Sequence, residues 1–382
     1  MFKNNRTLLL LILLVPFLSD CKNEKKSIKK SNISIDIAKK SEVSLFDIFS
    51  KVEIINLEIN DSSIIRSIKK LMVYKNDFYI LDLFSGKLFS FNENGIFNFK
   101  IDNKGQGPEE HINISDFDIN NDSISLLSSS DGKIHIYDLD GQFKRKHRLP
   151  RIQGNYDDIK YLNNDTIAFW TFDFNNRLKF YSKSGNDIFK ESKPQEDNIY
   201  TAFSTPVFPI SNYFVNTFDN QVMQMSTKGE LTVAYEWDFG ALNNDVANFK
   251  KAPDANDANS QKELHEFARK IYSSEIVNYF FGIAGGNSQY LYTQIMRNSK
   301  NVNIFYNKET KQNYVFEKTV EGANIFPIFW TEDYVIGFVP EIKEISIDDI
   351  LPDKILDEKN RANKMKISKF DNPILIKYYF KK

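Results

Sequence analysis

Residues 77–102 read DFYILDLFSGKLFSFNENGIFNFKID, and the pattern of this stretch returns along the chain. Runs of aromatic and β-branched residues alternate with polar breaks, which is typical of short β-strands. Counterparts of its first run are DSISLL (122–127), DTIAFW (165–170), NYFVNTF (212–218), SQYLYTQI (288–295) and DYVIGF (333–338). Counterparts of its second run, KLFSFNENG, are KIHIYDLDG (133–141), RLKFYSKSG (177–185), QVMQMSTKG (221–229), NVNIFYNKET (301–310) and, in altered form, NPILIKYYF (372–380).

Glycines mark the period of this repeat. Gly95, Gly141, Gly185 and Gly229 follow one another at intervals of 46, 44 and 44 residues. A period of about 40–45 residues with four short strands per unit is the signature of a β-propeller. One unit cannot bury both faces of its sheet alone, so the units must form a closed ring. The six occurrences predict an all-β, six-bladed β-propeller with four-stranded antiparallel blades over residues 45–382.

The two ends of the repeat predict how the ring closes. The run VEIINLE (52–58) precedes the first complete unit, whereas the last unit is one strand short and stops with NPILIKYYF (372–380). We expect the first run to pair beside the second as the outer strand of the last blade. This arrangement leaves no unpaired sheet edge at the seam.

Two insertions interrupt the repeat at about 243–280 and 341–368, and both are expected to be partly helical. In the first, Leu264, Phe267 and Ile271 follow helical spacing. We expect this helix to form a flap on one face of the propeller, with these side chains packed on the blades. A tolerated decoration and a role in binding both remain open.

The N-terminus has the pattern of an export signal. A short basic start precedes LLLLILLVPFL (8–18), which is too short to span a bilayer and fits a signal peptide. Cys21, the single cysteine of the chain, follows directly and resembles a bacterial lipoprotein box. The resemblance implies a lipoprotein signal peptide at 1–20 and lipidation of Cys21; an ordinary secretory signal is the alternative. The charged residues 21–44 are expected to form a flexible tether.

A wider resemblance is carried by residues 86–119, with Gly105-Gln106-Gly107-Pro108 followed by Glu109 or Glu110, and by the terminal Asp371-Asn372-Pro373. Over residues 45–380 the chain resembles a six-bladed β-propeller family of predicted bacterial lipoproteins, related to NHL-type propellers. This resemblance implies the fold and an exported, lipid-anchored location in the cell envelope. It implies no catalytic residues.

The segment Gly105, Gln106, Gly107, Pro108 and Glu109 allows two interpretations. Its glycine N–H groups could form an anion-binding nest. We favour a blade-to-blade crossover, in which glycine adopts positive φ and Pro108 fixes the backbone, because a lone Gly-x-Gly lacks the strand and helix of a phosphate loop.

Other polar candidates favour structural roles. The alternating Asp116, Asp118, Asn120 and Asp122 resemble the start of a calcium loop, but the required glycine and glutamate are missing, so turns explain them better. The histidines are spread over several units without metal-ligand spacing. We expect His111, His135 and His147 at the surface and His265 on the inserted helix.

Aromatic residues in or beside strands are expected mainly in the core, although some could line the mouth of the propeller and bind a sugar or peptide ring. These residues are Trp170, Trp237, Trp330, Phe169, Phe329 and Tyr334.

The function predicted from these patterns is an exported, membrane-anchored binding module for a protein, peptide or glycan of the cell envelope. We predict no catalytic residues, cofactor or metal ligands, and we expect a monomer. With 50 basic and 51 acidic residues, the chain lacks the charge of a nucleic-acid-binding protein. The alternatives are an enzyme, such as a lactonase-like hydrolase or a lyase with a divalent cation held by Asp, Glu and Asn at the centre, or a structural role.

Overall fold

The computed structural model describes most of the chain from residue 32 onward. The described residues are 32–38, 42–82, 84–172, 177–192, 213–215, 219–243, 258–277, 279–280, 285–339, 346–368 and 372–382. The chain divides into Met1–Lys30 and Ser31–Lys382, and all described residues belong to the second unit. The predicted signal peptide and Cys21 therefore lie outside the described residues. None of the helices described here is long and apolar enough to cross a membrane.

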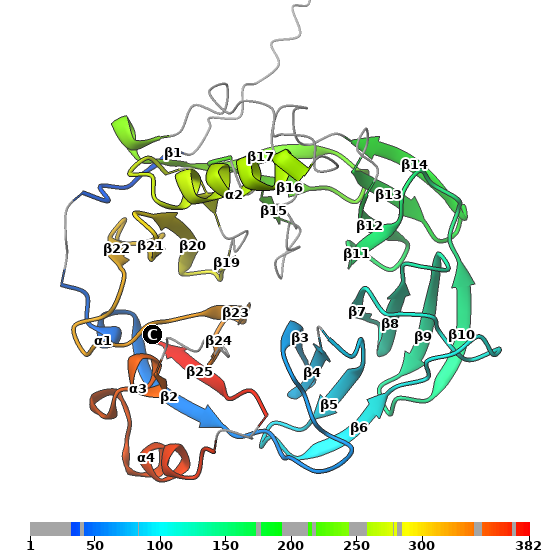
Figure 1. Cartoon of the computed structure of the whole chain (residues 1–382), viewed down its shortest axis with the longest axis horizontal. Coiled ribbons are helices and arrows are strands. Elements are labelled where there is room, and N and C mark those ends of the chain that lie inside the picture. The colour runs from blue at the N-terminus through cyan, green and yellow to red at the C-terminus, as the bar shows by residue number, and fades with distance from the viewer. Residues whose placement is uncertain are drawn as a thin grey trace, which may run out of the picture. The chain divides into compact units, whose positions relative to one another are not determined.

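Six sheets surround a common axis (Figure 1). In blades one to three the neighbouring strands are antiparallel, and the first strand is nearest the axis. Their strands are β3 (Ile68–Tyr74), β4 (Asp77–Asp82), β5 (Leu88–Phe91) and β6 (Phe97–Ile101); β7 (Asp116–Asn120), β8 (Ser123–Ser128), β9 (Lys133–Asp138) and β10 (Phe143–Arg148); and β11 (Tyr156–Tyr161), β12 (Thr166–Thr171), β13 (Leu178–Ser182) and β14 (Asp187–Ser192).

Blades four to six complete the ring, which confirms the predicted six-bladed, all-β propeller. The apolar run PVFPIS (206–211), which precedes NYFVNTF (212–218), lies outside the described residues. The described strands are β15 (Tyr213–Val215), β16 (Gln221–Met225) and β17 (Leu231–Asp238); β18 (Tyr279–Phe280), β19 (Gly285–Gly286), β20 (Tyr290–Arg297), β21 (Lys300–Asn307) and β22 (Asn313–Phe316); and β23 (Pro327–Trp330), β24 (Tyr334–Phe338) and β25 (Leu375–Phe380).

The hydrophobic core lies between neighbouring blades. All six residues of β12 are buried, because both faces of this middle strand are covered. Leu127 and Ile134 of blade two pack with Ile159 and Phe169 of blade three in one cluster. Each blade therefore needs its neighbours in order to bury its apolar side chains, which is the physical reason for a closed ring.

The periodic glycines occupy tight turns, and two of them closely approach the preceding blade. Gly141 has a φ of +77°, and a Cβ at this position would lie 2.5 Å from Cδ2 of Phe99 in blade one. Gly229 has a φ of +73° and approaches Phe180 of blade three. In blade three the positive φ falls on Asn186 instead of Gly185. Glycine is thus needed for both backbone conformation and close inter-blade approach.

The N-terminal strand closes the ring as predicted. The strand β2 (Phe49–Ile55) pairs antiparallel with β25 as the outer strand of blade six, starting three residues earlier than the predicted run. Just before it, α1 (Leu45–Ile48) begins at the cap residue Ser44. Blade six therefore combines the strand that precedes the first blade with the last strand of the chain described here, which closes the ring.

The second insertion covers the open edge of this closing strand. It contains α3 (Ile347–Ile350), the 3-10 helix η4 (Asp353–Ile355) and α4 (Glu358–Met365). Asn360 of α4 is buried; its Oδ1 accepts from the Ile54 N–H at 2.8 Å, and its Nδ2 donates to the Val52 carbonyl at 3.0 Å. One side-chain amide thus reproduces the pairing that a further strand would offer to β2.

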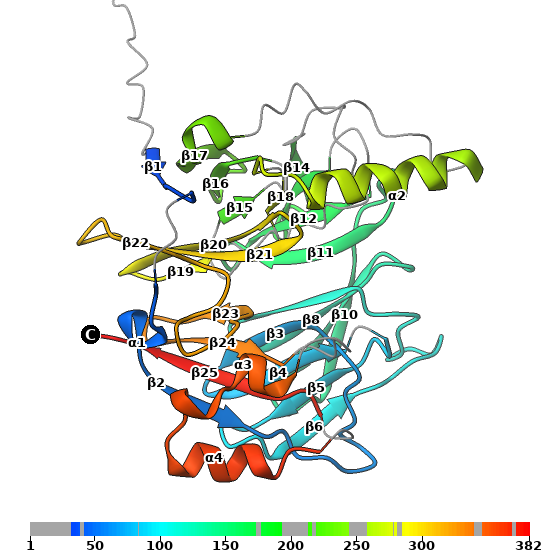
Figure 2. The ribbon, with the colours of Figure 1, turned by 60° about the vertical axis from the view of Figure 1, so that its left-hand side comes forward.

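The first insertion contains α2 (Ala258–Tyr272), which follows the short 3-10 helix η2 (Gly240–Leu242) (Figure 2). The C-terminal end of α2 is fastened to the β20–β21 turn, because the Ser299 N–H donates to the Tyr272 carbonyl at 2.7 Å. Ile271 is buried and Phe267 is half-buried, whereas the side chain of Leu264 lies outside the described residues. The predicted helix is present, and its role in binding stays a prediction.

The prediction of a flexible tether over 21–44 is wrong for residues 32–38. The strand β1 (Asn32–Ser34) pairs in parallel with β17 as the outermost described strand of blade four. Ile33, Ile35 and Ile37 are buried and alternate with exposed residues. This period of two matches a half-buried extended segment, but three isoleucines in a charged context gave too weak a signal in the sequence.

We expect Ile35→Ala to lower the free energy of unfolding by about 2–4 kcal/mol, because a fully buried side chain is removed from the cluster that includes Trp237. The exposed Ser34→Ala is the matched control and should change stability by less than about 0.5 kcal/mol. Urea unfolding of both variants measures the difference. Equal stabilities would show that β1 does not contribute to the folded propeller.

Candidate functional site

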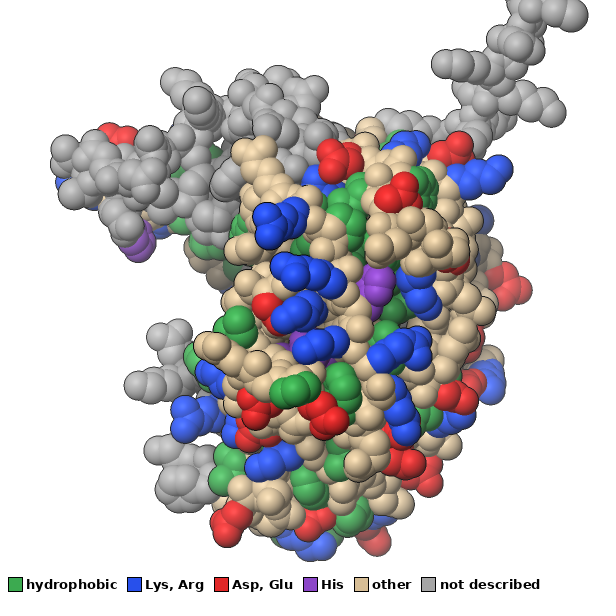
Figure 3. Space-filling view, turned by 90° about the vertical axis from the view of Figure 1, so that its right-hand side faces the viewer, with side chains coloured by type: hydrophobic (Ala, Val, Ile, Leu, Met, Phe, Trp, Pro, Cys, Tyr) green, Lys and Arg blue, Asp and Glu red, His purple; other side chains and the backbone are tan. Residues whose placement is uncertain are grey.

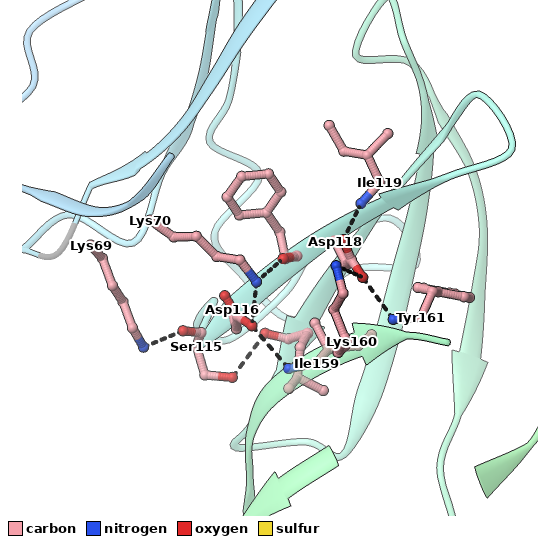
Figure 4. A network of polar contacts seen from close by, with 11 residues as sticks. Lys69, Lys70, Ser115, Asp116, Asp118, Ile119, Ile159, Lys160 and Tyr161 are labelled. Carbon is pink, nitrogen blue, oxygen red and sulfur yellow. Dashed lines mark hydrogen bonds and ion pairs between the residues drawn. The ribbon is translucent and has the colours of Figure 1, made fainter. Parts of the chain in front are cut away.

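Among the described strands, those nearest the axis have one edge that pairs with no other strand. Two consecutive lysines of β3, in blade one, reach two backbone carbonyls of blade two, one just before β7 and one within it (Figure 4). Lys69 Nζ donates to the Ser115 carbonyl, and Lys70 Nζ donates to the Phe117 carbonyl at 2.6 Å. Lys70 also forms an ion pair with Asp116 at 2.9 Å.

The same arrangement, with acceptors in place of donors, joins blade two to blade three. Oδ2 of Asp116 accepts from the Ile159 N–H at 2.9 Å, and Oδ2 of Asp118 accepts from the Tyr161 N–H at 2.7 Å (Figure 4). Both carboxylates are buried and lie two residues apart, as do the two N–H groups that they accept from. Their spacing matches the two-residue period of a strand, so they satisfy the free edge of β11.

Charges of both signs are concentrated in this axial network, which we define as Lys69, Lys70, Asp116, Asp118, Asp157, Asp158 and Lys160. Burial opposes the charged form of Lys70, but the nearby Asp116 and Asp118 outweigh it and raise the lysine pKa. Burial, together with the charge of Asp116, raises the pKa of Asp157 and raises that of Asp158 well above its usual range. Oδ2 of Asp158 is shielded from solvent and has no hydrogen-bond partner.

The axial network is arranged for hydrogen bonding rather than for holding a cation. Carboxylates do converge here, as a metal-dependent enzyme would need, but lysine ammonium groups lie among them: Lys70 on Asp116, and Lys160 at 3.9 Å from Asp118. In the part of the chain that is described, no three His, Cys, Asp or Glu side chains are placed to hold a metal ion.

The proposed start of a calcium loop is divided between two separate interactions. Asp116 and Asp118 face β11, whereas Asp122 lies at the β7–β8 turn and pairs with Lys75 at 2.7 Å and Tyr74 Oη at 2.7 Å. Asn120 is half-buried at the end of β7. These residues therefore do not share one set of ligands.

The crossover segment 105–109 has a different geometry from the predicted one. Neither Gly105 nor Gly107 has a positive φ, so the expected conformational reason for glycine is wrong. Instead, the Glu110 side chain folds over the loop: its Oε2 accepts from the Gly107 N–H at 2.7 Å, and a Cβ on Gly105 would lie 2.0 Å from it. The chain's own carboxylate thus occupies the position that an anion would take in a nest.

Two histidines expected at the surface are buried. His111 is 2% exposed and His135 is 0% exposed, and their rings pack edge to face at 5.7 Å between centroids. His111 follows the polar Pro108-Glu109-Glu110, whereas His135 stands between Ile134 and Ile136 of a buried strand, and only the crossover loop brings the two histidines together. His147 is half-buried against Tyr181, and His265 lies exposed on α2, as predicted.

The aromatic candidates mostly occupy the core. Their side chains are buried in inter-blade clusters, except for Tyr334, which is partly buried: Trp170, Trp237, Trp330, Phe169, Phe329 and Tyr334. Gly285 permits this packing at blade five, because a Cβ there would lie 2.1 Å from Nε1 of Trp330. A role in stacking on a ligand therefore has no support from these residues.

The sequence patterns missed the lysines and two of the aspartates of the axial network. The available signal was positional: Lys69-Lys70 and Asp157-Asp158 are charged pairs inside the first strands of units one and three, where the repeat calls for apolar residues. Aligning the units on their turn glycines places Lys69-Lys70 at the positions of Ser115-Asp116 in unit two, and places Asp157-Asp158 just before them. Charges at an interior position of a repeat indicate an axial role.

The buried histidines predict an acid-sensitive fold. Burial, opposed by Asp131 and reinforced by His111, lowers the pKa of His135 to about 4. As the pH falls, His135 binds a proton in the unfolded chain at about pH 6.5, but in the folded protein only at about pH 4. The free energy of unfolding is therefore highest above pH 6.5 and decreases as the pH falls from 6.5 to about 4. His135→Phe keeps an aromatic ring beside Phe143 but cannot bind a proton. The decrease in the free energy of unfolding between pH 7.5 and pH 4 should therefore be smaller than in wild type by about 2–3 kcal/mol.

Urea unfolding between pH 7.5 and pH 4 measures this effect, with His265→Phe on the exposed face of α2 as the control. Identical pH dependence in wild type and His135→Phe would contradict the assignment.

One solved structure supports the fold of this chain. A solved structure named a "putative exported protein" from Bacteroides fragilis has a TM-score of 0.71 at 19% identity, covering 92% of this chain and 100% of that one. A member of the duf4221 family from Bacteroides vulgatus has a TM-score of 0.49 at 9% identity, with coverages of 90% and 99%. A streptogramin B lyase reaches 0.41 at 13% identity over 74% of this chain and 78% of its own, which carries no argument about activity.

No curated protein has a significant sequence match to the chain. The family model described as "Domain of unknown function (DUF4934)" matches residues 30–379, which include the β1 segment and every blade. The chain therefore belongs to the DUF4934 family.

Proposed function

We propose that this protein is an exported, lipid-anchored propeller that binds a protein, peptide or glycan of the cell envelope through its axial network. The observation that carries the proposal is a set of charged side chains held rigidly between the inner strands of three blades. Recognition on a rigid scaffold needs few polar groups, provided that their positions are preorganised.

The axial network presents both positive and negative groups to a ligand. Lys69 is exposed and Asp157 is half-exposed, while behind them the half-buried Lys70 forms an ion pair with the buried Asp116. A partner with adjacent donors and acceptors, such as a peptide backbone or a sugar bearing hydroxyl groups, complements this pair. The buried members would keep the exposed ones in place, because moving Lys70 would leave Asp116 buried without its counter-charge.

The enzyme alternative is less favoured. A hydrolase or lyase that uses a divalent cation needs several oxygen ligands directed at one point. At the axis the carboxylates instead bond to backbone N–H groups and to lysines. Binding without chemistry requires no such ligand set.

The proposed location rests on the N-terminal pattern, and a protein named as exported has the same fold. We expect Cys21→Ala to move the protein from the membrane pellet to the soluble exported fraction, because three acyl chains exceed what stable anchoring requires. Cell fractionation measures the share of the protein in each fraction, and a parallel experiment blocks lipoprotein signal cleavage with a globomycin-type inhibitor. A variant that stays fully membrane-bound contradicts lipid anchoring at Cys21.

The binding proposal is tested with the double variant Lys69→Gln and Asp157→Asn, which removes both exposed charges and leaves the net charge unchanged. Capture of crosslinked partners from detergent-solubilised envelope should fall by about tenfold or more, since both anchor groups are lost. The control, Lys300→Gln with Glu317→Gln, removes an exposed ion pair from blade five and should retain capture. Undiminished capture by a correctly folded axial variant would place the binding surface elsewhere.

A further inference from the structure

One outer strand carries a concentration of positive charge that the fold does not require. The strand β10 reads FKRKHR, and the following loop adds Arg151. Between residues 141 and 156 the chain contains no Asp or Glu. Five basic side chains of this segment are exposed: Lys144, Arg145, Lys146, Arg148 and Arg151. We name this set the β10 stripe.

Most of this charge is not neutralised within the protein. Lys144 pairs with Asp138 at 2.6 Å. The other four cations of the β10 stripe form no ion pair with any residue that the structure describes. Figure 3 shows this side of the molecule, where Lys and Arg side chains gather around a histidine over the outer strands of blades two and three.

The remaining outer strands provide an internal comparison. Among those described, β6 contains one lysine, β14 combines Lys190 with Asp187 and Glu191, and β2 combines Lys51 with Glu53. Charged residues on an outer strand protect its edge from pairing with other chains. One to three charges, of mixed sign wherever there is more than one, meet this need on these strands, so the excess on β10 calls for another explanation.

The stripe covers both faces of the strand. Opposite β9, Arg145 lies across from Ile136 and His147 across from Ile134, while Lys146 and Arg148 alternate with them toward the other face. On the blade-three side, His147 bonds to the hydroxyl of Tyr181, and Lys183 lies 5.3 Å from the centre of the Tyr161 ring. Burial, followed by the charges of Lys183 and Arg145, lowers the pKa of His147. Positive charges lie close together here, and a bound anion would reduce the repulsion between them.

We propose that the β10 stripe is a second interaction surface, separate from the axial network, which binds a linear acidic polysaccharide bearing carboxylate or sulfate groups. The cations alternate between the two faces of this outer strand over about 13 Å at 3.3 Å per residue, so a linear polyanion that follows the edge of the strand meets cations from both sides. The free edge of β10 adds backbone donors and acceptors for hydroxyl groups.

The geometry favours a single polyanionic chain over a membrane. The stripe is one strand wide and is flanked by the exposed Asp140 before it and Asp187 on blade three. A membrane surface would require a broad basic face, which these carboxylates interrupt. The choice of polysaccharide over nucleic acid rests on the proposed export.

Binding is measured for the purified propeller, residues 22–382, with alginate and heparin as probes and neutral dextran as the reference. The triple variant Arg145→Ser, Lys146→Ser and Arg148→Ser should lose about tenfold or more in affinity, and wild-type binding should weaken as salt screens the charges. The control replaces Arg66, Lys228 and Lys366, which are exposed and scattered over other blades, with serine. It removes the same net charge and should bind like wild type.

Several results would overturn the proposal: no binding of either polysaccharide by wild type, equal affinity of the triple variant, or an equal loss in the scattered control. Tighter binding to vesicles with anionic lipid, or to single-stranded DNA, would assign the stripe to those partners instead. A triple variant that instead forms oligomers in light scattering, while its monomer fraction keeps wild-type affinity, would show that the β10 stripe serves only to protect the edge of the sheet. The axial double variant should bind both probes normally, so the two proposals fail independently.

Discussion

A β-sheet ends in an edge whose backbone groups need partners, and this constraint shapes the whole propeller. The ring closes because β2 pairs with β25, which joins the beginning of the propeller to its end. The open side of β2 is then satisfied by one buried amide, Asn360, from the second insertion. An insertion that interrupts the repeat is therefore part of the closure and not merely a tolerated addition.

The same constraint explains the charged axis. Inner strands of neighbouring blades are not paired with one another, so side chains bridge them: Lys69 and Lys70 reach the carbonyls of β7, and Asp116 and Asp118 accept from the N–H groups of β11. Such a network is costly unless every member is satisfied. Oδ2 of Asp158 is the exception, and an unsatisfied buried oxygen beside exposed charges is what a site for polar ligands would contain.

Two surfaces with different chemistry follow from this scaffold. The axial network mixes charges of both signs and is rigid, which suits recognition of a partner with defined donors and acceptors. The β10 stripe has one sign of charge on an outer strand, which suits a long polyanion held by electrostatics. Blade two contributes to both surfaces, because Asp116 and Asp118 lie on its innermost strand and the β10 stripe on its outermost strand.

The sequence by itself determined the number of blades, the positions of most strands and the closure by the N-terminal strand, since hydrophobic period, turn glycines and leftover runs are local signals. Only the tertiary structure decided which polar residues meet. Asp116 and Ile159 are 43 residues apart, and His111 reaches His135 through a crossover loop whose geometry depends on Glu110. It also decided that Ile33 and Ile35 belong to blade four, because a short alternating run becomes a strand only when the edge of β17 is there to receive it.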